Sequence, residues 1–140
     1  WTSSSAQKSE EGPPGPEMSA KPRGIRSGGS MGIETIGAAL VLTPEIKHLD
    51  ILSSKEFAER FAPAAKDART VILDLSQVEF VDSSGLGALL NLVRDTLGRG
   101  GRISICCPQP SVKVLFRMVQ LSKLVSIFDG KDAALAWAET

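Results

Sequence analysis

The sequence lacks the features that mark membrane proteins, exported proteins and nucleic-acid-binding proteins. Its 16 basic residues balance its 16 acidic residues, so no bulk charge attracts nucleic acid or an anionic membrane. No apolar run approaches the roughly 18 residues needed to cross a bilayer. The N-terminus also lacks the basic-then-apolar order of a signal peptide. We therefore expect a cytoplasmic protein that neither inserts into membranes nor binds nucleic acid directly.

Cysteine and histidine are scarce, since the chain has only Cys106, Cys107 and His48. Neighbouring residues of a strand point to opposite faces, so we expect no ordinary disulfide between the two cysteines. Two cysteines and one distant histidine do not make a zinc site, so we expect no metal and no cofactor. The simpler interpretation of the pair is buried, small hydrophobic side chains in a reducing compartment, and a redox role is the alternative.

Catalytic motifs are also missing. The chain has no GxSxG, HExxH, GxxxxGK[ST] or GxGxxG, and Gly85-Leu86-Gly87 is a lone GxG, which is a weak signal. A triad of Ser83, His48 and an aspartate would depend on a chance meeting in space. We predict that the protein is not an enzyme, and an enzyme remains the weakest hypothesis.

What is present suits one globular domain. The chain has 140 residues, of which 42% are hydrophobic. Residues 1–31 are rich in Ser, Gly, Pro and charge, and cannot bury enough surface to offset the entropy of ordering them. We expect residues 1–31 to be a flexible tail or a cloning leader and residues 32–140 to be the domain.

Strand and helix patterns alternate along the domain. Strands are expected at residues 33–36, 38–42, 70–75, 102–107 and 125–128. Helices are expected to start at Ser53 or Ser54, at the Asp82-Ser83 pair, at Pro110 and at Asp129 or Asp132. Pro63 is expected to stop or kink the first helix near Ala62, and Pro44 to limit its strand to an edge or a bend. The alternation predicts an α/β fold with a mixed, largely parallel sheet.

The stretch VILDLSQVEFVDSSGLGALL, residues 71–90, runs from a buried strand through a break into a helix. Apolar residues spaced by three and four mark the helix: Leu86, Leu89, Leu90, Val93 and Leu97. Capping by Asp82 or Ser83 explains the break, with Gly85 allowing a tight turn. The same geometry suits a switch. Free N–H groups at the helix N-terminus would tolerate a phosphate on Ser83, whose charge beside Asp82 would repel a partner.

These motifs together resemble the STAS domain, the fold of bacterial anti-sigma factor antagonists. The 71–90 stretch resembles the family signature, and Leu49-Asp50 resembles its LD motif before the first helix. Gly100-Gly101-Arg102 before a strand, and the run from Pro110 to Phe116, resemble two further motifs of the family. The resemblance covers about residues 33–138. It implies a sheet of about four to five strands with helices packed mainly on one side.

The resemblance also implies a regulatory role. An anti-sigma factor serine kinase would phosphorylate Ser83 with its own ATP, and a metal-dependent serine/threonine phosphatase would reverse the reaction. The unphosphorylated protein would bind the anti-sigma factor and so free a sigma factor for transcription. The implied partner-binding residues are Asp50, Asp82, Ser83, Ser84, Gly85 and Leu86.

One position departs from the family pattern, because Lys47-His48 replaces the glycine and acid that usually precede the LD pair. With Pro44 upstream, this change predicts a short or bent second strand and a different partner-facing rim. We interpret His48 as a solvated surface residue, with a contact or pH-sensitive role as the alternative. The alternative function is a STAS scaffold, or a transport-associated interaction domain, that phosphorylation does not regulate.

Overall fold

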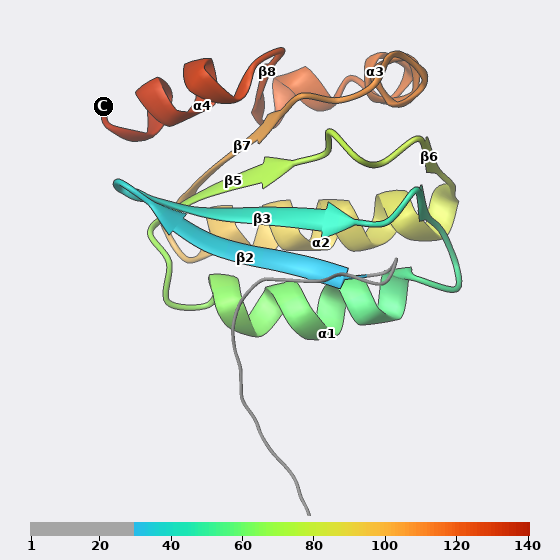
Figure 1. The fold of residues 1–140 in the computed structure, drawn as a ribbon, viewed down its shortest axis with the longest axis horizontal. Helices are drawn as coiled ribbons and strands as arrows, with labels where there is room; N and C mark the ends of the chain where they lie inside the picture. The colour runs from blue at the N-terminus through green and yellow to red at the C-terminus, as the bar shows by residue number, and fades with distance from the viewer. Residues whose placement is uncertain (1–29) are drawn as a thin grey trace, which may run out of the picture.

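The computed structural model describes residues 30–140, so the expected tail lies almost entirely outside the described residues. Strands and helices alternate along the chain (Figure 1). In chain order they are β2 (Ser30–Ile36), β3 (Ala39–Glu45), β4 (His48–Leu49), α1 (Ser54–Ala65), β5 (Thr70–Asp74), β6 (Phe80–Val81), α2 (Ser83–Gly98), β7 (Arg102–Cys106), α3 (Pro110–Met118), the 3₁₀ helix η2 (Leu121–Lys123), β8 (Ser126–Phe128) and α4 (Lys131–Ala138).

The main sheet has five strands in the order β2-β3-β5-β7-β8. β2 and β3 form an antiparallel hairpin, and every other pair in this sheet is parallel. All five residues of β5 are buried, as expected for a central strand covered on both faces. The prediction of a mixed, largely parallel sheet is confirmed.

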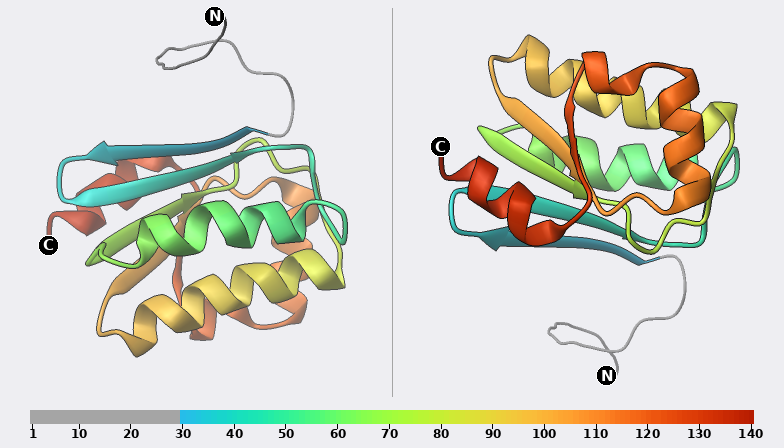
Figure 2. Two further views of the ribbon diagram at one scale, coloured as in Figure 1. Left: turned by 90° about the horizontal axis from the view of Figure 1, so that it is seen from below. Right: turned by 90° about the horizontal axis from the view of Figure 1, so that it is seen from above.

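The helices cover the sheet unequally. Figure 2 shows α1 and α2 side by side on one face and α4 on the other. The larger core cluster joins the sheet to buried residues of three helices: Phe57, Phe61, Leu89, Val93, Val112 and Phe116. In the smaller cluster, Ala134 and Ala138 of α4 are buried with Val41 and Ile72, and the partly buried Leu135 and Trp137 pack against them. Packing mainly on one side is therefore confirmed, with the short helix α4 on the second face.

The two prolines interrupt their elements less than expected. Pro63 lies inside α1, which continues to Ala65, so the expected end near Ala62 is wrong. A proline removes a single N–H donor, and here only the last residues of the helix follow it. Pro44 lies inside β3. The pairing of β3 with β5 ends at Leu42, so Pro44 pairs with β2 alone.

The buried face of α2 differs from the expected apolar stripe. Leu97 is 38% exposed, and Leu86 and Leu90 are half-buried. The buried positions are Gly85, Leu89, Leu92, Val93 and Thr96. α2 packs against α1 as well as the sheet, which rotates the buried face toward Leu92. Thr96 is accommodated because its hydroxyl donates to the Leu92 carbonyl at 2.9 Å.

The ends of the helices are only partly as predicted. Ser53 precedes α1, Asp82 precedes α2, and Pro110 is the first residue of α3. Gly130, rather than Asp129 or Asp132, is the cap residue of α4. Among residues 30–140, no helix combines the length and the apolar character needed to cross a membrane.

A second, two-stranded sheet was not predicted. β4 and β6 pair in parallel, with His48 opposite Phe80 and Leu49 opposite Val81. Each strand has two residues, too few for a periodic pattern in the sequence. Because α1 and α2 follow β4 and β6 closely, this pairing places their N-termini together.

Candidate functional site at the N-terminus of helix α2

Asp82 holds two loops together through its side chain. One carboxylate oxygen, Oδ1, accepts a hydrogen bond from the backbone N–H of Gly85 at 2.8 Å, which caps α2. The other, Oδ2, accepts from the backbone N–H of Ile51 at 3.1 Å, in the loop before α1. Asp82 also donates its own N–H to the Leu49 carbonyl at 3.2 Å. Asp82 is therefore the cap of α2 and a bridge between the loops at residues 50–53 and 82–85.

Gly85 allows the two loops to approach closely. A Cβ atom at this position would overlap the carbonyl oxygen of Leu49 and would crowd its side chain. The sequence predicted a glycine here only for a tight turn, and this close contact is a second reason for it. Gly85 is required because the backbone of β4 lies directly against the first turn of α2.

Ser83 is exposed at this site. It is the first residue of α2 and follows the cap Asp82 directly. Within residues 30–140, no hydrogen bond involves the Ser83 hydroxyl. Ser84 and Leu86 are half-buried, and the Leu86 N–H donates to the Asp82 carbonyl at 2.8 Å. The structure therefore leaves Ser83 exposed while its neighbours hold the turn.

Asp50 organises the neighbouring loop. Its Oδ1 atom accepts hydrogen bonds from the backbone N–H groups of Leu52 at 3.0 Å and Ser53 at 3.2 Å. The Ser53 hydroxyl donates to the His48 carbonyl at 2.8 Å and accepts from the Asp50 N–H at 3.0 Å. Ser53 makes no side-chain cap to α1, because its hydroxyl is used within this loop. The structure thus brings Asp50 and Asp82 to one site, joined through Ile51.

Two apolar side chains on this loop are exposed. Ile51 is 70% exposed and Leu52 is 88% exposed. Neither residue was among the expected partner-binding residues. The sequence did offer a signal for them. The two residues form an apolar pair in the short loop between the LD motif and α1, and loops run over the protein surface. Such exposed apolar side chains beside Ser83 suit contact with another protein.

Lys47 and His48, which depart from the family pattern, lie beside this loop. Lys47 accepts hydrogen bonds at its carbonyl from Glu79 at 2.7 Å and Phe80 at 3.1 Å, which continue the pairing of β4 with β6. The exposed His48 ring meets the Phe80 ring edge-on at 5.9 Å. The second strand is not short, since β3 has seven residues and extends through Pro44. The departure instead coincides with the extra strand β4.

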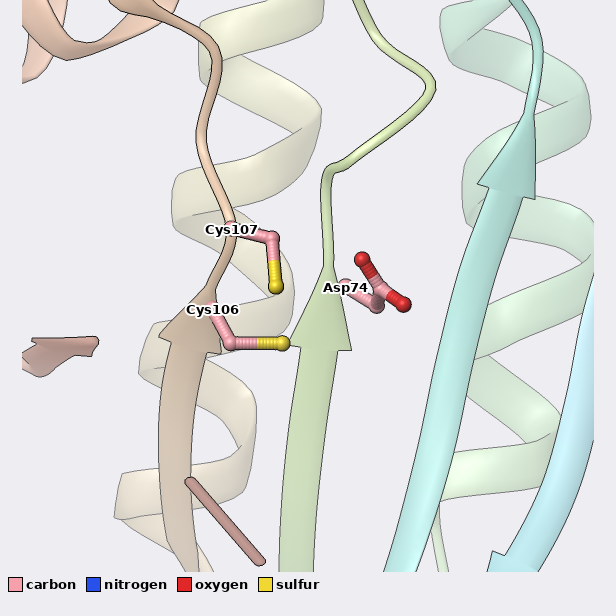
Figure 3. A group of neighbouring side chains, drawn as sticks. All are labelled: Asp74, Cys106 and Cys107. Atoms are coloured by element: carbon pink, nitrogen blue, oxygen red, sulfur yellow. The ribbon is translucent and has the colours of Figure 1, made fainter. Parts of the chain in front are cut away.

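A second group of chemically active side chains lies elsewhere. Asp74, Cys106 and Cys107 bring one carboxylate oxygen and two sulfur atoms within 4.8 Å of one another (Figure 3). The expectation that the cysteines point to opposite faces is wrong, because Cys107 adopts the left-handed conformation with φ of 59°. Both cysteines are free thiols. Asp74 was not expected beside the cysteines, because it comes from a different strand, β5.

Comparison with known proteins identifies the family. The sequence pattern of the STAS domain matches residues 30–134. An anti-sigma F factor antagonist from Paenibacillus polymyxa is 35% identical over 69 residues, which are 49% of this chain and 59% of that protein. For this and two further curated relatives, the match covers about 60% of the relative's length.

Solved structures share the fold. An anti-sigma factor antagonist from Mycobacterium paratuberculosis has a TM-score of 0.72 at 20% identity, over 79% of this chain and 94% of that one. The phosphorylated form of SpoIIAA, a Bacillus cell fate determinant, has a TM-score of 0.61 at 21% identity, over 76% of this chain and 97% of that one. The murine anion transporter Slc26a9 has a TM-score of 0.66 at 21% identity, over 76% of this chain and 18% of that one.

At these identities the structures establish the fold, and the family follows from the sequence match. The chain belongs to the STAS domain family, in which the anti-sigma factor antagonists are binding proteins rather than enzymes.

Proposed function

We propose that the protein is a phosphorylation-switched anti-sigma factor antagonist whose acceptor is Ser83. The observation that carries the proposal is an exposed serine at the first position of a helix, directly after a cap aspartate. The curated relative from P. polymyxa is an anti-sigma F factor antagonist. In this proposal the unphosphorylated protein binds an anti-sigma factor serine kinase in the cytoplasm and so frees a sigma factor for transcription.

The surroundings of Ser83 explain how a phosphate could act without unfolding the domain. The first turn of a helix carries free N–H groups and the positive end of the helix dipole, so added negative charge is tolerated there. Asp82 already accepts the Gly85 N–H and the Ile51 N–H. A phosphate on Ser83 would therefore be directed away from the Asp82 carboxylate, toward solvent and an approaching partner.

The binding surface in this proposal combines a neutral hydroxyl with apolar side chains. Ile51 and Leu52 project from the loop that Asp82 holds beside Ser83. A partner that buries both side chains must also desolvate Ser83. Phosphorylation adds close to two negative charges, which would then be buried without a counter-ion. The switch therefore changes affinity through desolvation and repulsion, and a metal-dependent serine/threonine phosphatase would restore binding.

The proposal is tested by incubating the protein with purified anti-sigma factor kinases, ATP and Mg²⁺, and measuring the intact mass. We expect the mass of one phosphate on the wild type and on Ser84→Ala, and none on Ser83→Ala. No gain on the wild type with any kinase, or the same gain on Ser83→Ala, would overturn the proposal. In a pull-down, Ser83→Ala should keep the partner and Ser83→Glu should lose it.

The shared fold with a transporter supports a second candidate function. In that case the protein is a scaffold or transport-associated interaction domain in which Ser83 only begins the helix. Leu52→Asp should abolish binding under both functions, because it places a charge on the apolar surface. Ser83→Glu distinguishes them: binding that survives Ser83→Glu and fails in Leu52→Asp supports the unregulated domain.

A further inference from the structure

The cluster of Asp74, Cys106 and Cys107 is separate from the Ser83 site. Cys106 packs in the smaller core cluster, beneath α4. Ser83 begins α2, which buries Gly85 and Leu89 and lies on the other face of the sheet (Figure 2). Asp74 and Cys106 are register partners on the parallel strands β5 and β7, so their side chains leave the sheet on the same face. Two donors of metal-binding type are therefore placed together by strand pairing alone.

Cys107 joins them because the chain leaves the strand conformation. β7 ends at Cys106, and Cys107 takes a positive φ of 59°, which is uncommon for a residue with a Cβ atom. Its backbone N–H is held by the Phe128 carbonyl at 2.9 Å. Figure 3 shows both sulfur atoms on the side of Asp74. The left-handed turn thus adds a third donor to the two that the strands supply.

We propose that Asp74, Cys106 and Cys107 bind one thiophilic divalent cation of the zinc class through a carboxylate oxygen and two thiolates. The three donor atoms lie within 4.8 Å of one another. Two thiolates on tetrahedral zinc are roughly 3.8 Å apart, given Zn–S bonds of about 2.3 Å. Small side-chain rotations therefore suffice to close the site around an ion. The soft sulfur donors favour zinc or cadmium over magnesium or calcium.

The charges around the cluster favour a divalent ion. With both thiols deprotonated, the three groups carry three negative charges, and Asp74 and Cys106 are 6% and 0% exposed. Lys131 supplies one positive charge, with its Nζ 3.9 Å from Asp74 Oδ2. A divalent cation together with Lys131 balances the three negative charges. Without the cation, burial, and then the nearby Asp74 carboxylate, raise the pKa of the Cys106 thiol.

The cluster also has an oriented ligand and a route of entry. Asp74 Oδ1 accepts the backbone N–H of Ser76 at 3.0 Å, which fixes the carboxylate as outer-shell bonds do in metal sites. Asp74 and Lys131 line a surface cleft of about 490 Å³ beside β2 and β3. An ion can therefore reach the Asp74 carboxylate from solvent through this cleft.

The test is a cobalt titration of the full, reduced, metal-free chain, followed by zinc competition. Cys106 and Cys107 are the only cysteines of the chain, so thiolate-to-cobalt charge-transfer absorption reports on this pair alone. We expect that absorption to saturate at one equivalent of Co²⁺, with the visible bands of tetrahedral cobalt, and zinc to remove both. Zinc should also raise the midpoint of thermal unfolding.

Variants separate this site from other binding. Cys107→Ser should lose the charge-transfer absorption, and Asp74→Asn should weaken cobalt binding at least about tenfold. Both avoid replacing the fully buried Cys106, and circular dichroism confirms that they fold. His48→Ala and Asp132→Asn are matched controls outside the cluster and should bind cobalt as the wild type does. Absence of the absorption at one equivalent in the reduced wild type, or its persistence in Cys107→Ser, would overturn the proposal.

Discussion

Asp74 and Asp82 make opposite use of a carboxylate at the end of a strand. Both oxygens of Asp82 accept backbone N–H groups, from Gly85 and Ile51. Asp74 is 6% exposed, and among residues 30–140 its Oδ2 atom has only the Lys131 ammonium nearby, at 3.9 Å. A carboxylate whose two oxygens both accept backbone N–H groups acts as a structural bridge. A carboxylate with spare acceptor capacity beside two thiols is itself a candidate ligand.

The difference also concerns where strain is placed. The Ser83 site reaches a close backbone approach through a glycine, Gly85, so no side chain is distorted. The thiol cluster uses a cysteine in a conformation that favours glycine. The first arrangement suits a rigid surface for a partner, and the second suits a position retained for the chemistry of its side chain.

The largest expected effect tests the close approach at the first site. Gly85→Ala should lower the free energy of unfolding by about 3 kcal/mol, because the added methyl group would overlap the Leu49 carbonyl. Gly87→Ala is the matched control, since no atom lies within 4 Å of its added Cβ. That control should raise the free energy of unfolding by about 0.5–1 kcal/mol. Urea denaturation measures both, and equal stabilities would contradict the backbone contact.

The next effect tests Asp82 as a bridge. Asp82→Ala should lower the free energy of unfolding by about 2 kcal/mol, from the lost helix cap and the lost bond to Ile51. Asp82→Ser can restore the cap and not the bridge, so it should recover about half of the loss. Asp95→Ala, at an exposed position of the same helix, is the control and should change stability little.

A smaller effect tests the strain at the second site. Cys107→Gly should raise the free energy of unfolding of the metal-free protein by about 1 kcal/mol, because glycine adopts positive φ without a Cβ clash. Gln120→Gly should give a similar gain, since Gln120 has a φ of 57°. The two variants should differ in cobalt titration, which only Cys107→Gly abolishes. A loss of stability in Cys107→Gly, with a gain in Gln120→Gly, would show that the positive φ of Cys107 does not strain the metal-free protein.

The smallest effect tests whether the first site tolerates charge. Ser83→Asp should raise the free energy of unfolding by about 0.5 kcal/mol at low ionic strength, through the helix dipole. Added salt should reduce that gain. Asn91→Asp is the control, because Asn91 is exposed in the middle of α2 and has Asp95 one turn away. It should show no gain. A marked destabilisation by Ser83→Asp would contradict a switch that leaves the fold intact.

Much of the first site could be predicted because its signals are local. The β5 strand is a continuous apolar run, and the break at Asp82-Ser83 combines cap residues with the start of a helical period. The exposed serine and its cap aspartate follow from those features. The exposed Ile51 and Leu52 were missed, because apolar residues in a short loop are usually interpreted as buried.

Local patterns in the sequence were enough to predict the strands of the main sheet, the four α-helices, the mixed sheet and the family, because hydrophobic periodicity and capping depend on neighbours along the chain. Only the tertiary structure decided which distant groups meet. The pairing of β4 with β6 brings Ile51 to Asp82, and the pairing of β5 with β7 brings Asp74 to Cys106. Cys107 joins them through a left-handed turn that its local sequence does not require. These contacts depend on strand register and backbone conformation, which are selected by the packing of the whole domain.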